Sequence, residues 1–252
     1  MEQKRMVRRG IYILPNLFTT ASLFTGFMAI IWAAEGSVNA ERFEWSAMAI
    51  LFSALMDGLD GKVARLTGTA SEFGVQYDSL ADLVAFGVAP GFLVYAWMIN
   101  VYGRTGAAMG FLFATCGALR LARFNVAAAS GASKKFFIGL PIPAAGCCLA
   151  TLVFFVPFLP DFMMPIVPGF TLLLTATLGI LMVSRVRYYS FKEYGFLKTH
   201  RYRSMVTVIL LFSLVVAAPK LWGFLLFFVY LVVGIVYTFV LLPKKTHLPF
   251  TN

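Results

Sequence analysis

The chain has 252 residues, of which 60% are hydrophobic and 13% are charged. Soluble domains carry about 45–50% apolar and about 25% charged residues, so this composition excludes an ordinary soluble protein and indicates an integral membrane protein. The formal net charge of +10 does not indicate a nucleic-acid partner, because the basic residues flank apolar segments, where lipid headgroups and membrane topology account for them.

Apolar segments follow one another along almost the whole chain. A spanning helix needs about 20 mostly apolar residues. The sequence therefore predicts an all-α polytopic membrane bundle with about eight transmembrane helices, at 15–34, 43–66, 73–101, 104–127, 139–158, 163–183, 203–218 and 220–242. The last two are separated only by Pro219-Lys220, which leaves a single bent hairpin as an alternative. Without linkers or repeats, we expect one domain over 1–252, with a catalytic core at about 10–185 and extra helices at about 203–242.

The distribution of basic residues predicts how these helices cross the membrane. With the N-terminus on the cytoplasmic side, 18 of the 21 Lys and Arg residues fall on that side. Only Arg42, Arg104 and Lys220 fall outside. Because cytoplasmic loops are enriched in Lys and Arg, we expect both termini to be cytoplasmic and the protein to lie in the cell membrane.

Carboxylates are concentrated between the second and third predicted helices. The window 57–82 contains four of the five aspartates of the chain: Asp57, Asp60, Asp78 and Asp82. Asp57 and Asp60 are three residues apart and Asp78 and Asp82 are four apart, so each pair shares one helix face. In the predicted topology both pairs lie at cytoplasmic helix ends, where the short turn LTGTASE brings the two acidic faces together.

Four converging carboxylates repel one another, so such a site needs protons, basic partners or hard cations. Carboxylate oxygens suit Mg²⁺, Mn²⁺ or Ca²⁺ better than zinc. Two divalent cations are the natural solution for this number of carboxylates, and two-metal sites typically serve phosphoryl chemistry.

The residues around the aspartates fit the same interpretation. Gly61 and Gly74 remove side-chain bulk on the acidic faces, where a ligand or a second backbone comes close. Arg65 lies one turn beyond Gly61 and is placed to reach a phosphate as a planar donor. Ser71 offers a hydroxyl in the connecting turn.

Two alternatives remain open for the acidic window. The aspartates could form a buried ion network with Lys62, Arg65, Arg120 and Arg123, although such a network does not require the regular spacing or the glycines. They could also line an ion or proton pathway. That function predicts carboxylates spread through the membrane depth, whereas here they are concentrated at one face.

The pattern Asp57-x-x-Asp60-Gly61-x-x-Ala64-Arg65, then eight residues, then Gly74-x-x-x-Asp78-x-x-x-Asp82 resembles the signature of the CDP-alcohol phosphatidyltransferases, with no departure at any fixed position. These enzymes use divalent metal and an alcohol to displace CMP from a CDP-linked lipid. The resemblance implies that the four aspartates bind two Mg²⁺ or Mn²⁺ ions and that Asp82 is also the general base. It further implies that Gly61, Arg65 and Ser71 contact the nucleotide or its phosphates, and Gly74 and Asn16 are further candidate contacts of the CDP-lipid.

Four further stretches resemble the phosphatidylserine synthase branch of this family: LPNLFTTASLFTGF (14–27), DSLADLVAFGVAP (78–90), GALRLARFN (117–125) and FFIGLPIPAAG (136–146). This resemblance implies CDP-diacylglycerol and L-serine as substrates, and a homodimer. The nearest alternative is a sibling enzyme that uses glycerol 3-phosphate or inositol phosphate as the acceptor. These acceptors are more anionic than serine, so they favour a pocket with more basic residues.

Serine is a zwitterion, so its pocket needs a cation for the carboxylate. Arg120, Arg123 and Asn125 lie at the cytoplasmic end of the fourth predicted helix and are candidate acceptor ligands. For both arginines, anchoring to lipid phosphates is an equally good interpretation. Asn16 follows Pro15 at an expected helix start, where it either caps the helix or contacts the nucleotide, and capping is slightly favoured.

Overall fold

The computed structural model describes residues 2–68, 71–129, 137–184, 186–188 and 219–236. This part of the chain is helical apart from two strands of two residues each, so the predicted all-α class is confirmed. The strands β1 (Phe137–Ile138) and β2 (Arg187–Tyr188) pair antiparallel, with Phe137 opposite Tyr188 and Ile138 opposite Arg187.

The helices follow one another with short connections. The first half of the chain contains α1 (Glu2–Glu35), α2 (Glu41–Thr67), α3 (Glu72–Asp82), the π-helical turn η1 (Leu83–Val88), α4 (Ala89–Trp97), the 3₁₀ turn η2 (Ile99–Tyr102) and α5 (Arg104–Ala129). The second half contains α6 (Ile142–Phe155), the 3₁₀ turns η3 (Val156–Phe158) and η4 (Asp161–Ile166), α7 (Val167–Val183) and α10 (Pro219–Val236).

Four described helical stretches are long and apolar enough to cross a membrane: Pro15–Glu35, Glu72–Trp97, Arg104–Ala127 and Asp161–Val183. Each coincides with a predicted span. The stretches Ile142–Phe158 and Lys220–Gly234 are apolar but shorter, and α2 carries Glu44, Asp57 and Asp60 along its length. The predicted helix 203–218 lies outside the described residues, so the count of eight spans and the cytoplasmic termini stay predictions.

The start of the first helix differs from the prediction. Helix α1 begins at Glu2 and continues through Pro15, instead of starting there. The residues before Pro15 include good helix formers, so the helix continues although an interior proline removes one hydrogen bond and crowds the carbonyl four residues back. Asn16 therefore lies in the helix interior, and the prediction that it caps the first helix is wrong.

Close backbone contacts join the helices around η1. A Cβ atom on Gly26 of α1 would lie 2.7 Å from Ala85 Cα, and one on Gly146 of α6 would lie 2.9 Å from the Phe86 carbonyl oxygen. Small residues permit this approach, which is a common way to pack membrane helices. Ala85 and Phe86 are fully buried, so the turn after Asp82 is held on two sides.

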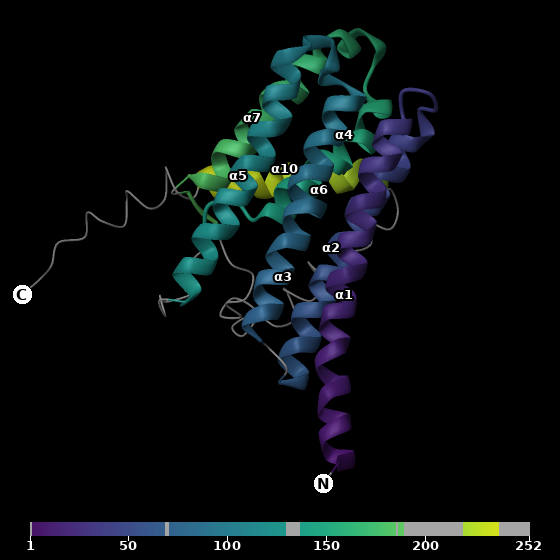
Figure 1. Ribbon diagram of the computed structural model, residues 1–252. Helices are drawn as coiled ribbons and strands as arrows, with labels where there is room; N and C mark the ends of the chain where they lie inside the picture. The colour runs from purple at the N-terminus through teal and green to yellow at the C-terminus, as the bar shows by residue number, and fades with distance from the viewer. Residues whose placement is uncertain (1, 69–70, 130–136, 185, 189–218, 237–252) are drawn as a thin grey trace, which may run out of the picture.

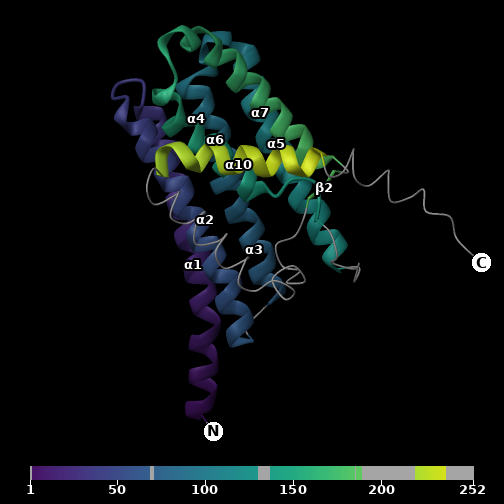
Figure 2. The same ribbon diagram turned by 180° about the vertical axis from the view of Figure 1, so that it is seen from behind.

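Most of the long helices run in roughly the same direction, whereas α10 crosses them (Figure 1). Figure 2 shows this yellow helix lying across the bundle from the other side. Helix α10 packs mainly against α6, and Phe224 contacts Phe155 with ring centroids 4.9 Å apart. At its first turn, Lys220 Nζ donates to Glu44 Oε2 at 2.7 Å, which ties α10 to the start of α2.

Candidate active site

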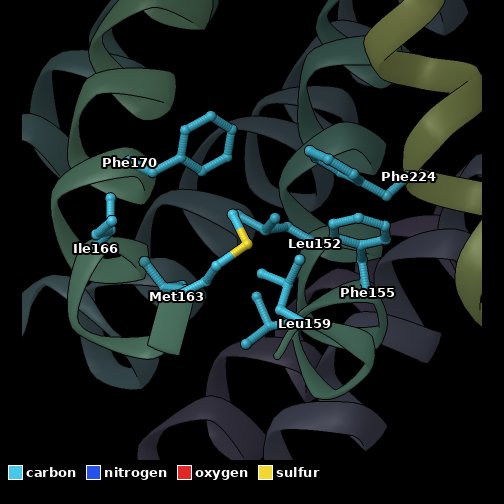
Figure 3. A pocket seen from close by; sticks show the side chains of 9 residues that line it. Leu152, Phe155, Leu159, Met163, Ile166, Phe170 and Phe224 are labelled. Carbon is cyan, nitrogen blue, oxygen red and sulfur yellow. The ribbon is translucent and has the colours of Figure 1, made fainter. Parts of the chain in front are cut away.

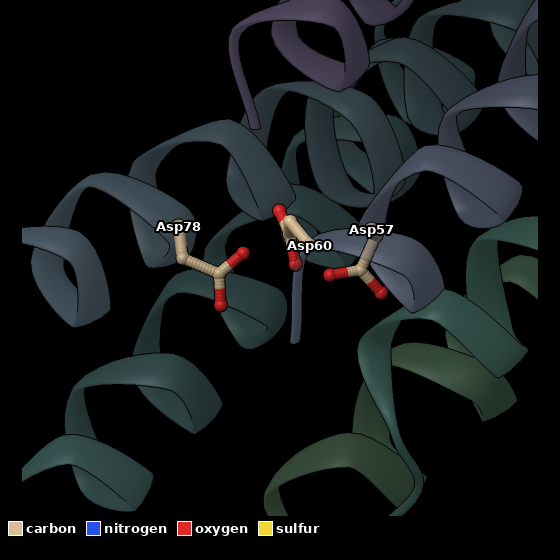
Figure 4. A group of neighbouring side chains, drawn as sticks. All are labelled: Asp57, Asp60 and Asp78. Atoms are coloured by element: carbon tan, nitrogen blue, oxygen red, sulfur yellow. The ribbon is translucent and has the colours of Figure 1, made fainter. Parts of the chain in front are cut away.

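Three aspartates from two helices converge as the spacing predicted. Asp57 and Asp60 lie on α2 and Asp78 lies on α3. Each offers one carboxylate oxygen, and these oxygens all lie within 4.8 Å of one another. Figure 4 shows the Asp78 carboxylate directed from its own helix toward the two aspartates of α2.

Asp82, the last residue of α3, completes the cluster. It is buried, with 9% of its surface exposed, and its carboxyl group lies within hydrogen-bonding reach of Asp57. The π-helical turn η1 begins at the next residue. At its end, the Ala89 N–H donates a hydrogen bond to the Val84 carbonyl, five residues earlier in the chain. Such turns often occur at functional sites. Here the turn directly follows Asp82, the last aspartate of the cluster.

The electrostatics of this cluster favour bound cations. The carboxylate oxygens lie within 4.8 Å of one another, and two unit charges at that distance repel by roughly 3.5 kcal/mol at an effective dielectric constant of about 20. Every donor of the cluster is a carboxylate oxygen, which is the ligand set of Mg²⁺ and Mn²⁺. The residues present therefore fit a site for hard divalent cations.

The described side chains form no ion pair with an aspartate of the cluster, although Arg120 interacts electrostatically with Asp82. Their ion pairs join Arg42 to Glu35 and Lys220 to Glu44. Neither pair includes an aspartate of the cluster. Lys62 and Arg123, two of the cations considered for such a network, are exposed. The side chain of Arg65 lies outside the described part of the structure.

Helix α1 contributes a residue that the sequence analysis missed. Thr19 is 4% exposed and its Oγ1 donates to Asp60 Oδ2 at 2.7 Å, with the Pro15 carbonyl a longer alternative at 3.2 Å. On the same helix, Thr20 Oγ1 lies 2.9 Å from the Tyr77 hydroxyl of α3. The available signal was the grouping of Asn16, Thr19 and Thr20 at the start of the apolar stretch Pro15–Glu35.

The small and polar residues predicted to contact a CDP-lipid lie at the exposed side of the cluster. A Cβ atom on Gly61 would meet nothing within 4 Å, so open space adjoins it. A Cβ atom on Gly74 would lie 3.2 Å from Ser71 Oγ and 3.7 Å from Asn16 Oδ1, which brings these three residues together. Ser71 caps α3, because its Oγ accepts a hydrogen bond from the Gly74 N–H at 3.0 Å.

The predicted acceptor residues on α5 have three different environments. Arg120 is half-buried and interacts electrostatically with Asp82 and with Tyr230 of α10. Its Nε is the one buried side-chain nitrogen or oxygen without a hydrogen-bond partner among the described residues. Arg123 is exposed. Their spacing did not distinguish the two arginines, but the fold directs only Arg120 toward the aspartates.

Asn125 connects α5 to α3. Its Nδ2 donates to Gln76 Oε1 at 3.1 Å and to Ser79 Oγ at 3.0 Å. These contacts fix the helix that carries Asp78 and Asp82. A positioning role is thus visible in the structure, and the acceptor role of Asn125 stays a prediction.

Comparison with known proteins agrees with this geometry. Residues 12–181 match the family model of the CDP-alcohol phosphatidyltransferases. The chain is 38% identical over 237 residues, 93% of this chain and 94% of the relative, to a protein of Helicobacter pylori strain J99 named CDP-diacylglycerol–serine O-phosphatidyltransferase. It is 36% identical over 180 residues, 71% of this chain and 75% of the relative, to a protein of that name from Methanocaldococcus jannaschii.

A third relative carries a different name. The archaetidylserine synthase of Methanothermobacter thermautotrophicus is 34% identical over 177 residues, which cover 69% of each chain. The family match spans α2 and α3 and thus includes all four aspartates. The chain belongs to the CDP-alcohol phosphatidyltransferase family.

Proposed function

We propose that this protein transfers the phosphatidyl group of CDP-diacylglycerol to the hydroxyl of L-serine, giving phosphatidylserine and CMP. The observation that carries the proposal is the convergence of carboxylates from α2 and α3 at one site. The choice of serine is supported by two relatives whose names include it and which align with 93% and 71% of this chain. In the reaction a P–O bond to the serine oxygen forms and the P–O bond to CMP breaks.

The proposed metal ligands are Asp57, Asp60, Asp78 and Asp82, which would hold two Mg²⁺ or Mn²⁺ ions. Bound there, the ions neutralise charge on the diphosphate and on the departing CMP. Thr19 orients one of these carboxylates through its hydrogen bond to Asp60. The open space beside Gly61 leaves room for the nucleotide, whose other proposed contacts are Arg65, Ser71, Gly74 and Asn16.

Asp82 is the proposed general base that accepts the serine hydroxyl proton. It is buried, with 9% of its surface exposed, so water has limited access to it. A base in that place favours attack by a bound alcohol over attack by water. General bases typically contribute about 10²–10⁴-fold to a rate.

Arg120 is the proposed ligand of the serine carboxylate. Its guanidinium neighbours Asp82, so a carboxylate bound there brings the serine hydroxyl toward the base. A guanidinium binds a carboxylate through two parallel N–H donors, and the Nε of Arg120 has no partner among the described residues. Arg123 and Asn125 lie farther along α5, and we assign them secondary roles at the acceptor entrance.

We further propose that the active site faces the cytoplasm and that the protein forms a homodimer in the cell membrane. The cytoplasmic orientation of the site is inferred from the basic residues. Of the 21 Lys and Arg residues, 18 fall on the predicted cytoplasmic side. In the structure, the end of α2 and the start of α3 lie at the same end of the bundle as the start of α1 (Figure 1). That arrangement supports a site near the cytoplasmic surface.

CMP release tests the proposal directly. Purified protein in detergent receives CDP-diacylglycerol, Mg²⁺ or Mn²⁺, and serine, glycerol 3-phosphate, inositol or inositol phosphate in separate reactions. We expect release with serine alone, its loss on chelation, and its loss in Asp82→Asn. Release with another acceptor would contradict the serine assignment, and metal-independent release would contradict the metal site.

A further inference from the structure

Buried hydroxyl groups line the interface between α1 and α2, which pack side by side (Figure 1). Ser22 and Ser53 each donate a hydrogen bond to the main-chain carbonyl of the other, at 3.3 Å and 3.1 Å. Thr25 Oγ1 lies 2.6 Å from Ser53 Oγ. Nearer the turn between the two helices, Ser46 Oγ donates to the Ala29 carbonyl at 2.7 Å. The three serines are at most 1% exposed, so these bonds are shielded from the surroundings.

These bonds form a repeating series that ends at the proposed metal site. Ser46, Ser53 and Asp60 are seven residues apart along α2, and each meets α1 through a hydrogen bond. Seven residues are close to two helical turns, so the three side chains lie along one face of α2. We call these bonds between α1 and α2 the interhelical seam. Its last member is the bond from Thr19 to Asp60.

The buried hydroxyls of α6 and α7 make different contacts. Thr151, Thr171 and Thr175 are also buried, but each donates to a carbonyl of its own helix, a common bond for Thr in a helix interior. These two helices meet the start of α10 around an apolar cavity of about 180 Å³, whose lining includes Leu152 and Phe224 (Figure 3). Bonds across the α1–α2 interface are therefore not the general way in which this bundle places its hydroxyl groups.

The seam fixes how α1 and α2 are aligned along their axes. Packing between membrane helices has little directionality, whereas a hydrogen bond weakens steeply when its atoms are displaced. A slip of α1 by one helical turn would move its residues by about 5.4 Å along α2, which would break the reciprocal bonds of Ser22 and Ser53. The same slip would separate Thr19 from Asp60. The seam and the metal ligand therefore depend on one register.

We propose that Ser53 is a positioning residue for the metal site, which holds α1 and α2 in the register in which Thr19 orients the Asp60 carboxylate. This inference rests on the proposed function. Ser53 precedes Asp57 by about one helical turn and Asp60 by about two, so a displacement of α2 at Ser53 is carried to both carboxylates. Ser53 lies outside the acidic signature, which begins at Asp57.

Mn²⁺ binding tests this role without relying on catalysis. Protein in detergent is freed of metal with EDTA, dialysed and titrated with Mn²⁺, and free Mn²⁺ is measured by electron paramagnetic resonance. Loss of a direct partner of a metal ligand typically lowers affinity by about 10–100-fold. Because Ser53 acts through Thr19 and not on the metal ligand itself, we expect Ser53→Ala to raise the Kd for Mn²⁺ by about threefold to tenfold.

Ser46→Ala is the matched control, because it removes the same kind of bond one repeat farther from the aspartates. We expect this variant to bind Mn²⁺ like the unmodified protein. Unchanged affinity in Ser53→Ala, or an equal loss in Ser46→Ala, would overturn the positioning role. If Ser53→Ala does not fold, Thr25→Val is tested in its place, because it removes the hydroxyl next to Ser53 Oγ from a half-buried position.

A double variant shows whether Ser53 acts through Thr19. If it does, Ser53→Ala combined with Thr19→Val binds Mn²⁺ about as weakly as Thr19→Val alone, because the bond that the register protects is already absent. Independent effects would multiply, and that result would contradict the proposal. Failure of the unmodified protein to bind Mn²⁺ would instead refute the metal site of the proposed function, so the two failures are distinguishable.

Discussion

The hydrogen bond from Thr19 to Asp60 gives a sharp test of how the metal site is built. Thr19→Val replaces a buried hydroxyl by a methyl group of similar size and removes the 2.7 Å bond to the carboxylate. A hydrogen bond to a charged group is worth about 1.5–3 kcal/mol, and about 1.4 kcal/mol corresponds to a tenfold change in affinity. We therefore expect the Mg²⁺ or Mn²⁺ concentration for half-maximal activity to rise by about tenfold to a hundredfold.

The assay is CMP release titrated with metal at saturating CDP-diacylglycerol and serine. Thr19→Ser keeps the donor and should preserve most of the affinity for metal. Thr20→Val is the matched control, because Thr20 pairs with Tyr77 and not with an aspartate of the cluster. An unchanged metal requirement in Thr19→Val, or an equal change in the control, would refute the reasoning that Thr19 orients a metal ligand.

Four further predictions concern the acceptor, the α3–α5 connection and two glycines. Arg120→Gln should raise the KM for serine by about tenfold or more, since a charge-assisted bond is lost, while the KM for CDP-diacylglycerol stays unchanged; substrate titrations check this. Asn125→Ala should lower the thermal midpoint in detergent and reduce activity with every acceptor alike, whereas a selective change in serine KM would contradict its positioning role. Gly26→Ala should cost about 1–3 kcal/mol of stability through overpacking, because its Cβ would lie 2.7 Å from Ala85 Cα. Gly61→Ala, which meets nothing within 4 Å, should keep its thermal midpoint and lose CMP release.

The sequence by itself determined the class of protein and the centre of its chemistry. Composition identified a membrane protein, and segment lengths predicted the helices, including the continuous stretch from Glu72 to Trp97. Helical periodicity alone placed the aspartates in pairs on two faces. Because a short turn joins the two helices, the convergence of Asp57 and Asp78 followed almost without tertiary information, and the structure confirms it.

Other features depended on contacts between residues far apart in the chain. Thr19 lies 41 residues from Asp60, and no local spacing relates them. Arg120 and Arg123 share a helix face in the sequence, but only Arg120 is directed toward Asp82. The interior position of Asn16 also required the structure, because local rules place a proline at a helix start and do not report that α1 continues before it.

Helix α10 shows most clearly what only the tertiary structure decided. Its composition predicts a span like the others, yet in the structure it crosses the bundle (Figure 2) and packs mainly against α6. An apolar helix can bury its side chains against lipid or against other helices of the protein. Hydropathy alone therefore does not predict which of the two environments the helix occupies. The choice was made by pairwise contacts, such as Lys220 with Glu44 and Phe224 with Phe155, which exist only once the chain has folded.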